Sequence, residues 1–208
     1  MQDFFEKFIS QVEQTSLLEY IAVITGIASV FFSKKENILV YPVGLINTVI
    51  YVFISVEGSL FGEASVNFYY TVMSIYGWIL WTRRDQQHHF VLRITKSSTR
   101  EWLQQLLFFA FFYVVIFLAL TWARKAFYAN TIPVLDAFAS ATAFTGMWLM
   151  TKKKVESWYW WIATNITSIP LYFIKGYVLT SLYYFILLII AFFGLAEWLQ
   201  RAKSKKRI

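Results

Sequence analysis

Hydrophobic residues occur in seven long runs, and the short segments between the runs carry most of the charge. The runs cover residues 18–33, 38–56, 61–82, 102–123, 133–151, 156–174 and 177–199. An α-helix needs about 20 mainly apolar residues to cross the hydrocarbon core of a bilayer. Strands of a membrane barrel would instead give shorter segments of alternating polarity. The pattern therefore predicts an all-α integral membrane protein with seven transmembrane helices.

Composition supports this class and excludes others. Hydrophobic residues make up 58% of the 208 residues and charged residues 15%, whereas a soluble domain carries roughly 25% charged residues. The absence of cysteine excludes a disulfide scaffold, a thiolate zinc site and a cysteine nucleophile. We expect no catalytic residue, metal or cofactor, because His88 and His89 are the only histidines and lie in a basic loop. An integral-membrane enzyme is the alternative from another class, and it would need a nucleophile–base pair, paired acids or metal ligands.

The first 17 residues are predicted to form an interfacial segment rather than a signal peptide. Residues 1–16 contain one Lys against three acidic residues and no cleavage-type ending. One helical face would carry Phe4, Phe5, Phe8, Ile9 and Val12. We therefore expect a short helix lying on the membrane surface.

Basic residues are distributed unequally between the two sides that seven helices would define. Fifteen of the nineteen Lys and Arg residues fall on one side, in the segments around 34–35, 83–100, 152–154 and 201–207. Basic residues concentrate on the cytoplasmic side of membrane proteins, so we expect the N-terminus outside and the C-terminus inside. Basic loops near anionic lipid headgroups also account for the net charge of +7 without a nucleic-acid partner.

The chain resembles itself at an offset of about 118 residues. This offset aligns Tyr41 with Tyr159, Asn47 with Asn165 and Gly58 with Gly176, and one residue less aligns Gly77 with Gly194, Trp81 with Trp198 and Arg84 with Arg201. Two three-helix repeats, 18–84 and 133–200, would then flank a basic loop and connector helix at 85–132, with a basic tail at 201–208. A repeat of three helices joined by one crossing is parallel, the 3+1+3 layout of SWEET-like transporters.

Polar residues at membrane depth are the candidate ligand contacts. Asn47 and Asn165 lie near the middle of the second and sixth runs, and a polar side chain inside a membrane usually faces protein or a wet cavity. Each Asn could instead form a hydrogen bond to a neighbouring helix that only stabilises helix packing. We favour a ligand site, in which the two amides meet indole rings across a shared cavity.

Helical spacing adds neighbours to each amide. The spacing i, i+3, i+7 places three residues on one helix face, and it occurs at Trp158, Trp161 and Asn165, at Gly44, Asn47 and Tyr51, and at Asn67, Tyr70 and Ser74. Aromatic faces with one amide suit a flat, weakly polar or cationic ring. The centres of the runs contain no Asp, Glu, His, Lys or Arg, so we expect transport without proton coupling.

The segment from Glu156 to Asn165 contains the pattern W-x-x-W-x-x-x-N and resembles the PnuC family of bacterial vitamin transporters. The segments 41–44 (YPVG) and 74–78 (SIYGW) are also similar to that family. The resemblance covers nearly the whole chain. It implies a multi-pass protein of the bacterial cytoplasmic membrane and a homotrimer with one site in each protomer.

The resemblance also implies an activity. Members carry nicotinamide riboside inward by facilitated diffusion, and cytosolic phosphorylation traps it. By that resemblance Trp158, Trp161 and Asn165 would contact the substrate, whereas Asn47, Asn67 and Tyr70 are added from spacing and depth. Similar proteins carry thiamine, riboflavin or deoxynucleosides, so another vitamin or nucleoside is the alternative substrate.

Overall fold

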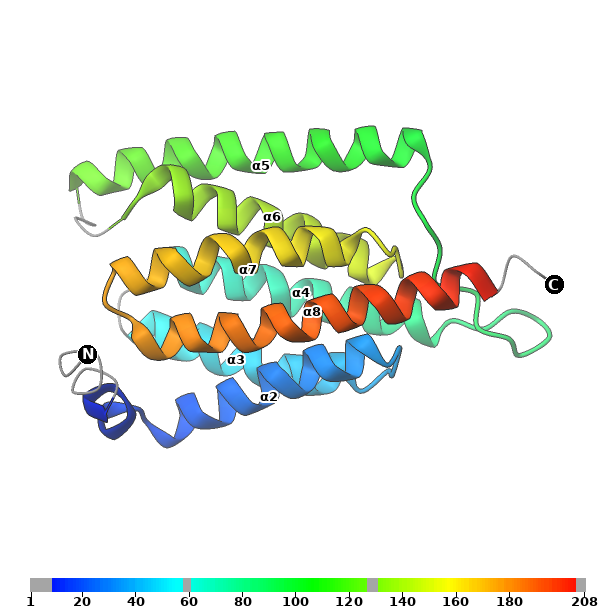
Figure 1. Ribbon diagram of the computed structural model, residues 1–208, viewed down its shortest axis with the longest axis horizontal. Coiled ribbons are helices and arrows are strands. Elements are labelled where there is room, and N and C mark those ends of the chain that lie inside the picture. Colours follow the sequence, from blue (N-terminus) through cyan, green and yellow to red (C-terminus); the bar gives the residue numbers. More distant parts are fainter. Residues whose placement is uncertain (1–8, 58–60, 127–130, 205–208) are drawn as a thin grey trace.

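Long helices make up most of the part of the chain that the structure describes. The computed structural model describes residues 9–57, 61–126 and 131–204, with the backbone alone at 61–62 and 124–126. The helices are α2 (Leu17–Lys34), α3 (Val40–Glu57), α4 (Phe61–Thr82), α5 (Thr99–Ala126), α6 (Pro133–Thr151), α7 (Ser157–Ile174) and α8 (Val178–Ser204). They run side by side along the long axis, and α2 begins at the end of the bundle opposite to that where α8 ends (Figure 1).

The observed helices follow the predicted runs closely, and local sequence explains where two of them begin. Ser16 and Glu19 form a capping box at the start of α2, which satisfies two backbone N–H groups that the first turn would leave without partners. Ser98 and Glu101 make the same pair of contacts at the start of α5. α8 continues to Ser204, beyond its apolar run, where Arg201 pairs with Glu197 one turn earlier.

The predicted N-terminal segment is described in part. Residues 1–8 lie outside the described residues, and residues 9–14 are helical. Gln11 donates to the carbonyl of Gly176 at 2.6 Å and accepts from the N–H of Leu179 at 3.0 Å. This segment therefore packs against the turn between α7 and α8.

The helices pack as two triplets, α2–α4 and α6–α8. Within each triplet, consecutive helices are in contact, and the triplets meet where α2 packs against α8 and α4 packs against α6. α5 packs along α6 at the flank of the bundle (Figure 1). If α2, α3 and α4 correspond to α6, α7 and α8, then the α2–α8 contact and the α6–α4 contact are the same contact made twice.

Two tryptophans make this duplicated contact in atomic detail. The indole N–H of Trp81 donates to the carbonyls of Met150 and Thr151 at 3.3 and 3.2 Å. The indole N–H of Trp198, 117 residues later, donates to the carbonyls of Ser33 and Lys34 at 3.1 Å each. These acceptors are also 117 residues apart, so each triplet donates to the carbonyl end of the other triplet's first helix.

The offset of 117 also holds for α3 and α7, and this corrects part of the predicted alignment. The Tyr41 ring packs edge-on against Trp81 and close to Gly77, whereas Trp158 packs edge-on against Trp198 and close to Gly194. Tyr41 therefore corresponds to Trp158 and not to Tyr159, which is 42% exposed and stacks on Trp102.

The predicted pairing of Asn47 with Asn165 is wrong for the same reason. The Asn47 amide donates to the carbonyl of Ala22 in α2 at 2.6 Å. Its counterpart at an offset of 117, Thr164, donates to the Thr142 hydroxyl in α6 at 2.9 Å. A helix turns about 100° per residue, so an error of one residue in register places the two amides on different faces.

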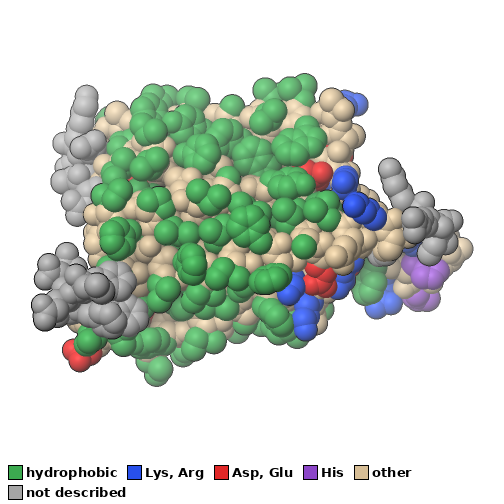
Figure 2. Space-filling model, in the orientation of Figure 1, with side chains coloured by type: hydrophobic (Ala, Val, Ile, Leu, Met, Phe, Trp, Pro, Cys, Tyr) green, Lys and Arg blue, Asp and Glu red, His purple; other side chains and the backbone are tan. Residues whose placement is uncertain are grey.

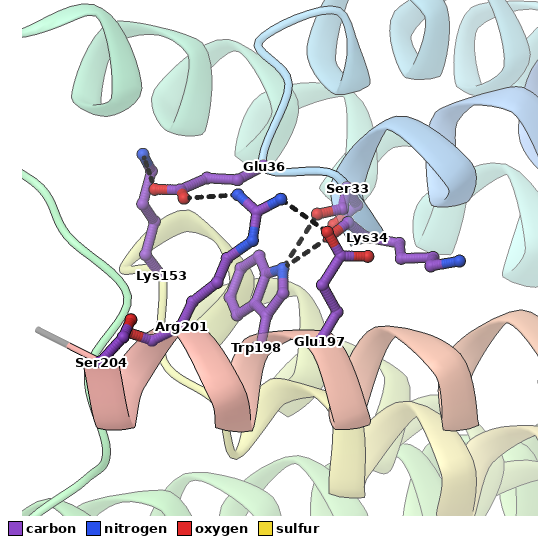
Figure 3. Close-up of polar contacts among 8 residues, drawn as sticks. All are labelled: Ser33, Lys34, Glu36, Lys153, Glu197, Trp198, Arg201 and Ser204. Atoms are coloured by element: carbon purple, nitrogen blue, oxygen red, sulfur yellow. Dashed lines mark hydrogen bonds and ion pairs between the residues drawn. The ribbon is translucent and has the colours of Figure 1, made fainter.

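Charged side chains gather at the end of the bundle that carries the α2–α3 and α6–α7 turns, here called the basic end. Lys153 pairs with Glu36 at 2.8 Å, and Arg201 contacts the other oxygen of Glu36 at 3.1 Å. Figure 3 shows Trp198, Glu197 and Arg201 projecting from α8 towards the α2–α3 turn, with Lys153 approaching Glu36 from the other side. Glu36 and Lys153 are themselves 117 residues apart, and both have a positive φ, of 58° and 52°.

The sides of the bundle are apolar. Figure 2 shows hydrophobic side chains over the middle of one face and most Lys, Arg, Asp and Glu residues at the basic end. Among the described helices, α2, α3, α5 and α8 are long and apolar enough to cross a membrane by length and composition. The structure is thus that of an all-helical, multi-pass membrane protein.

Candidate functional site

A cavity of about 100 Å³ lies between the two helix triplets. Residues from both triplets line it: Ser29, Val30, Ser33, Val40, Tyr41 and Ser74 from α2–α4, and Met147, Met150, Trp158, Trp161, Asn165, Leu187 and Ala191 from α6–α8. The cavity therefore brings together Trp158, Trp161 and Asn165, the three residues of the W-x-x-W-x-x-x-N pattern. Their spacing on α7 places them on one face of that helix.

Trp161 lines the cavity with its aromatic ring, and packing against a neighbouring helix holds this ring in place. One face of its indole packs on Gly146 of α6, where an added Cβ would lie 3.2 Å from the ring. The ring of Tyr70 lies 6.2 Å away between centroids. Gly146 thus allows α6 to approach closely enough to fix the indole.

Trp158 is fully buried, with 0% of its surface exposed. The edge of its ring packs against Gly194, where a Cβ would lie 2.5 Å from Cη2, and Trp198 packs against it at 5.6 Å and 88°. Among the described residues, the Trp158 Nε1–H has no hydrogen-bond partner. A buried N–H that lacks a partner costs about 1–3 kcal/mol, so this donor is suited to a group that enters the cavity.

Asn165 contributes the polar atom that the sequence predicted at this depth. The side chain is 2% exposed, and its Oδ1 is buried without a hydrogen-bond partner in the part of the chain that the structure describes. An amide oxygen accepts hydrogen bonds. Three of the residues that line the cavity thus carry a buried polar atom that the described protein groups leave without a partner: Trp158, Asn165 and Tyr41.

The other three predicted contacts lie outside the cavity lining. Tyr70 reaches the site only through its contact with the Trp161 ring. The Asn47 amide is bonded to α2, and Asn67 donates to the carbonyl of Glu63 in its own helix at 3.0 Å. The predicted shared cavity with two amides is thus not found, because Asn165 alone of the two central amides lines it.

Sequence reasoning missed the contribution of the first triplet. Four hydroxyl side chains line the cavity from α2, α3 and α4, namely Ser29, Ser33, Tyr41 and Ser74. The helical spacing on the third run includes Ser74 and the repeat alignment includes Tyr41, but neither pattern marks them as ligand contacts. The offset of 117 would have found Tyr41, since it aligns this residue with Trp158.

The cavity lining offers binding chemistry rather than bond-breaking chemistry. Among its residues there is no Asp, Glu, His, Lys or Arg. Across the described ranges, no group of three His, Asp or Glu side chains is placed to hold a metal ion. The arrangement can stack on a flat ring and hydrogen-bond to its substituents.

Comparison with known proteins gives one consistent family. The model of the nicotinamide mononucleotide transporter family matches residues 16–200. The chain is 25% identical to the nicotinamide riboside transporter PnuC of Escherichia coli (strain K12), over 91% of this chain and 88% of that protein. It is 26% identical to PnuC of Neisseria mucosa, over 76% of this chain and 60% of that protein.

Two further comparisons give a relative named for another substrate and a solved structure with the same fold. The riboflavin/roseoflavin transporter RibM of Streptomyces davaonensis is 22% identical over 88% of this chain and 85% of that protein. The crystal structure of the vitamin B3 transporter PnuC superposes with a TM-score of 0.74 and 23% identity, covering 97% of this chain and 88% of that one. With its all-helical apolar fold and its match from residue 16 to residue 200, the chain belongs to the PnuC family of membrane transporters, and it is a transporter rather than an enzyme.

Proposed function

We propose that this protein carries nicotinamide riboside inward across the bacterial cytoplasmic membrane by facilitated diffusion, and that phosphorylation in the cytosol traps the product. The observation that carries the proposal is the cavity between the triplets, where two indoles adjoin an unpartnered amide oxygen. The pyridinium ring of the riboside is flat and cationic, and indole faces attract such rings. Its carboxamide N–H groups complement Asn165 Oδ1. Relatives named as nicotinamide riboside transporters support the substrate.

Uncoupled transport follows from the chemistry of the lining. A proton-coupled carrier usually needs a titratable relay at membrane depth, and the residues that line this cavity include no carboxylate, histidine or basic group. Stacking replaces a buried counter-charge for the cationic ring. Net movement would then be driven by the substrate gradient that phosphorylation maintains.

Another vitamin is the second candidate substrate. The similarity to a riboflavin/roseoflavin transporter favours a site that can be adapted to other flat rings, and thiamine is also an aromatic cation. Competition calorimetry with nicotinamide riboside, thiamine, riboflavin and nucleosides would rank these ligands. Tighter binding of any of them than of the riboside would transfer the proposal to that ligand.

We also propose that all seven helices span the membrane in a 3+1+3, SWEET-like arrangement of parallel repeats. α4, α6 and α7 are not among the helices that are apolar enough to cross a membrane by composition alone, but twelve of the nineteen residues of α6 are buried. A helix that faces protein can carry the Thr, Ser and Asn side chains that a lipid-facing helix cannot. The contacts that recur 117 residues apart support the same arrangement.

The basic end is proposed to face the cytoplasm, which places the N-terminus outside. Because the chain contains no cysteine, single cysteines report on the two ends without background. Lys96→Cys, at the basic end, should react with a membrane-impermeant thiol reagent only from the cytoplasmic side. Tyr177→Cys, in the α7–α8 turn, is the matched control and should react only from outside. The reverse result would invert the orientation.

A homotrimer is proposed from the resemblance to the PnuC family, with the outer face of α5 as its contact surface. Large exposed side chains form one stripe along this helix, at Leu103, Leu107, Phe111, Val114 and Leu118. Their spacing of three and four residues suits packing against another helix. The mass of the purified protein in detergent, measured by light scattering with the detergent contribution subtracted, should equal three chains, and a monomer would refute the proposal.

The deciding experiment is uptake by purified protein in liposomes. Radiolabelled nicotinamide riboside should equilibrate across the membrane without chemical change, and ionophores should not alter its final level. Accumulation driven by an imposed proton or sodium gradient would contradict uncoupled transport. Chemical conversion of the riboside would instead indicate an enzyme, and absence of uptake would reject the proposed function.

A further inference from the structure

The two walls of the cavity differ in chemistry. The wall formed by α6–α8 consists of aromatic, Met, Leu and Ala side chains with one amide, whereas the wall formed by α2–α4 adds four hydroxyl groups to two valines. A ligand made of an aromatic ring joined to a sugar has the same division. Its ring needs stacking surface and its sugar needs hydrogen-bonding groups that both donate and accept, as hydroxyls do.

On the wall formed by α2–α4, the hydroxyl of Tyr41 lacks a partner among the described residues. The side chain is 1% exposed, and its Oη is buried without a hydrogen bond to any described residue. A buried hydroxyl in this state destabilises the protein, because it has lost its hydrogen bonds to water. Such a cost is expected where the hydroxyl serves a bound ligand.

The Tyr41 ring is held firmly in place. Trp81 packs edge-on against it at 5.1 Å and 88°. Gly77 lies so close that an added Cβ would overlap the tyrosine ring, including its hydroxyl. Because the ring cannot turn to find another partner, the position of the hydroxyl is fixed before a ligand arrives, which lowers the entropic cost of binding.

Serine hydroxyls extend the same wall. Ser29 donates to the carbonyl of Val40 at 2.8 Å, and Ser33 donates to the sulfur of Met150 at 2.9 Å. In each case the proton is engaged, and the hydroxyl oxygen retains lone pairs that accept hydrogen bonds. The wall thus offers acceptors beside the unpartnered hydroxyl of Tyr41.

We propose that Tyr41 is a substrate-binding residue, and that its hydroxyl hydrogen-bonds to the ribose while Trp161 and Asn165 hold the nicotinamide ring. The assignment rests on the proposed function, because it requires a substrate with a sugar. It makes the first triplet the sugar side of the site and the second triplet the ring side. The triplets therefore bind two parts of one molecule and must approach each other to enclose it.

The test is the substitution Tyr41→Phe, which removes one oxygen atom. Binding of nicotinamide riboside and of nicotinamide, which lacks the sugar, is measured by calorimetry or by displacement. We expect riboside affinity to fall about fivefold to tenfold, the value of one hydrogen bond, and nicotinamide affinity to stay the same. The unfolding temperature without ligand should not fall, because no hydrogen bond within the protein is lost.

Tyr159→Phe is the matched control, since it removes the same atom from an exposed residue beside Trp158 but outside the cavity. It should leave both affinities unchanged. Unchanged riboside affinity in Tyr41→Phe would overturn the assignment while leaving the proposed function intact. Equal losses for both ligands would overturn it as well. Failure of the unmodified protein to bind riboside would instead reject the proposed function.

Discussion

The two helix triplets share a backbone plan but differ at the positions that meet the cavity. At an offset of 117 residues, Tyr41 stands where the second triplet has Trp158, Gly44 where it has Trp161, and Thr48 where it has Asn165. The duplicated tryptophan contacts preserve the frame, whereas the two indoles and the amide of the cavity come from the second triplet. The helix contacts that recur in both triplets therefore form the frame of the bundle. The side chains of the cavity, in contrast, come from positions where the two triplets differ.

The position of Trp161 gives the physical reason for this asymmetry. Its counterpart Gly44 lies against α2, where an added Cβ would be 2.9 Å from the Ser29 hydroxyl. A large ring is therefore excluded from this position of the first triplet. The site offers the aromatic surface of Trp161 on one side and hydroxyl groups on the other, rather than a pair of indoles enclosing the ring.

The basic end shows a second departure from symmetry. Glu36 and Lys153 occupy equivalent turns and pair with each other across the two triplets. Two residues of the same charge at these positions would repel each other, and two neutral residues would form no ion pair. The Glu36–Lys153 pair therefore requires residues of opposite charge. Arg201 adds to this pair, whereas its counterpart Arg84 packs over the ring of Phe90 instead.

The largest expected effect on this comparison comes from Glu36→Gln. The substitution removes the carboxylate that Lys153 and Arg201 share. Because the Lys153–Glu36 pair is part-buried and Arg201 keeps Glu197, the loss in the free energy of unfolding should be about 2–3 kcal/mol, above that of an exposed pair and below that of a fully buried one. Unfolding in detergent measures the loss. Arg84→Met is the control at the equivalent of Arg201 and should cost under about 0.5 kcal/mol. Equal losses in the free energy of unfolding would mean that the two equivalent sites at the basic end contribute equally to stability.

Gly194→Ala and Gly77→Ala test whether the duplicated frame is equally tight in both triplets. Each new methyl group would overlap a ring, Trp158 or Tyr41, and overpacking of this kind costs about 1–3 kcal/mol in stability. We expect similar losses in thermal unfolding for the two variants. A loss in only one of them would show that the frames differ.

Trp161→Ala removes the aromatic surface that the first triplet cannot supply. Loss of a desolvated cation–π contact costs about 2 kcal/mol, so affinity for nicotinamide riboside should fall roughly thirtyfold in calorimetry. Trp122→Ala is the control, because Trp122 is exposed on α5 away from the cavity. Unchanged affinity in Trp161→Ala would remove this indole from the site.

Trp81→Phe and Trp198→Phe should have the smallest effect. Each removes one indole N–H that is shared between two carbonyls of the other triplet, at a cost of about 1 kcal/mol. Urea or thermal unfolding should give nearly equal losses for the two variants. A clear inequality would mean that the symmetric contacts are not energetically equivalent.

Much of the fold could be predicted because its signals are local. The apolar runs placed the helices to within a few residues, and the pattern at Trp158, Trp161 and Asn165 names three residues that line one cavity because they share one helix. Asn47 failed because its assignment depended on aligning two helices far apart in sequence. Tyr41 was missed for the same reason, as a shift of one residue paired it with Tyr159.

The sequence by itself determined the membrane class, the positions of the helices, the basic end and the aromatic face of α7, since each follows from composition or from periodicity within one segment. Only the tertiary structure decided which faces of α2, α3 and α4 meet that helix, and that Glu36 pairs with Lys153. The reason is that side chains within one helix are related by a fixed rotation per residue, whereas contacts between triplets depend on how separate helices pack.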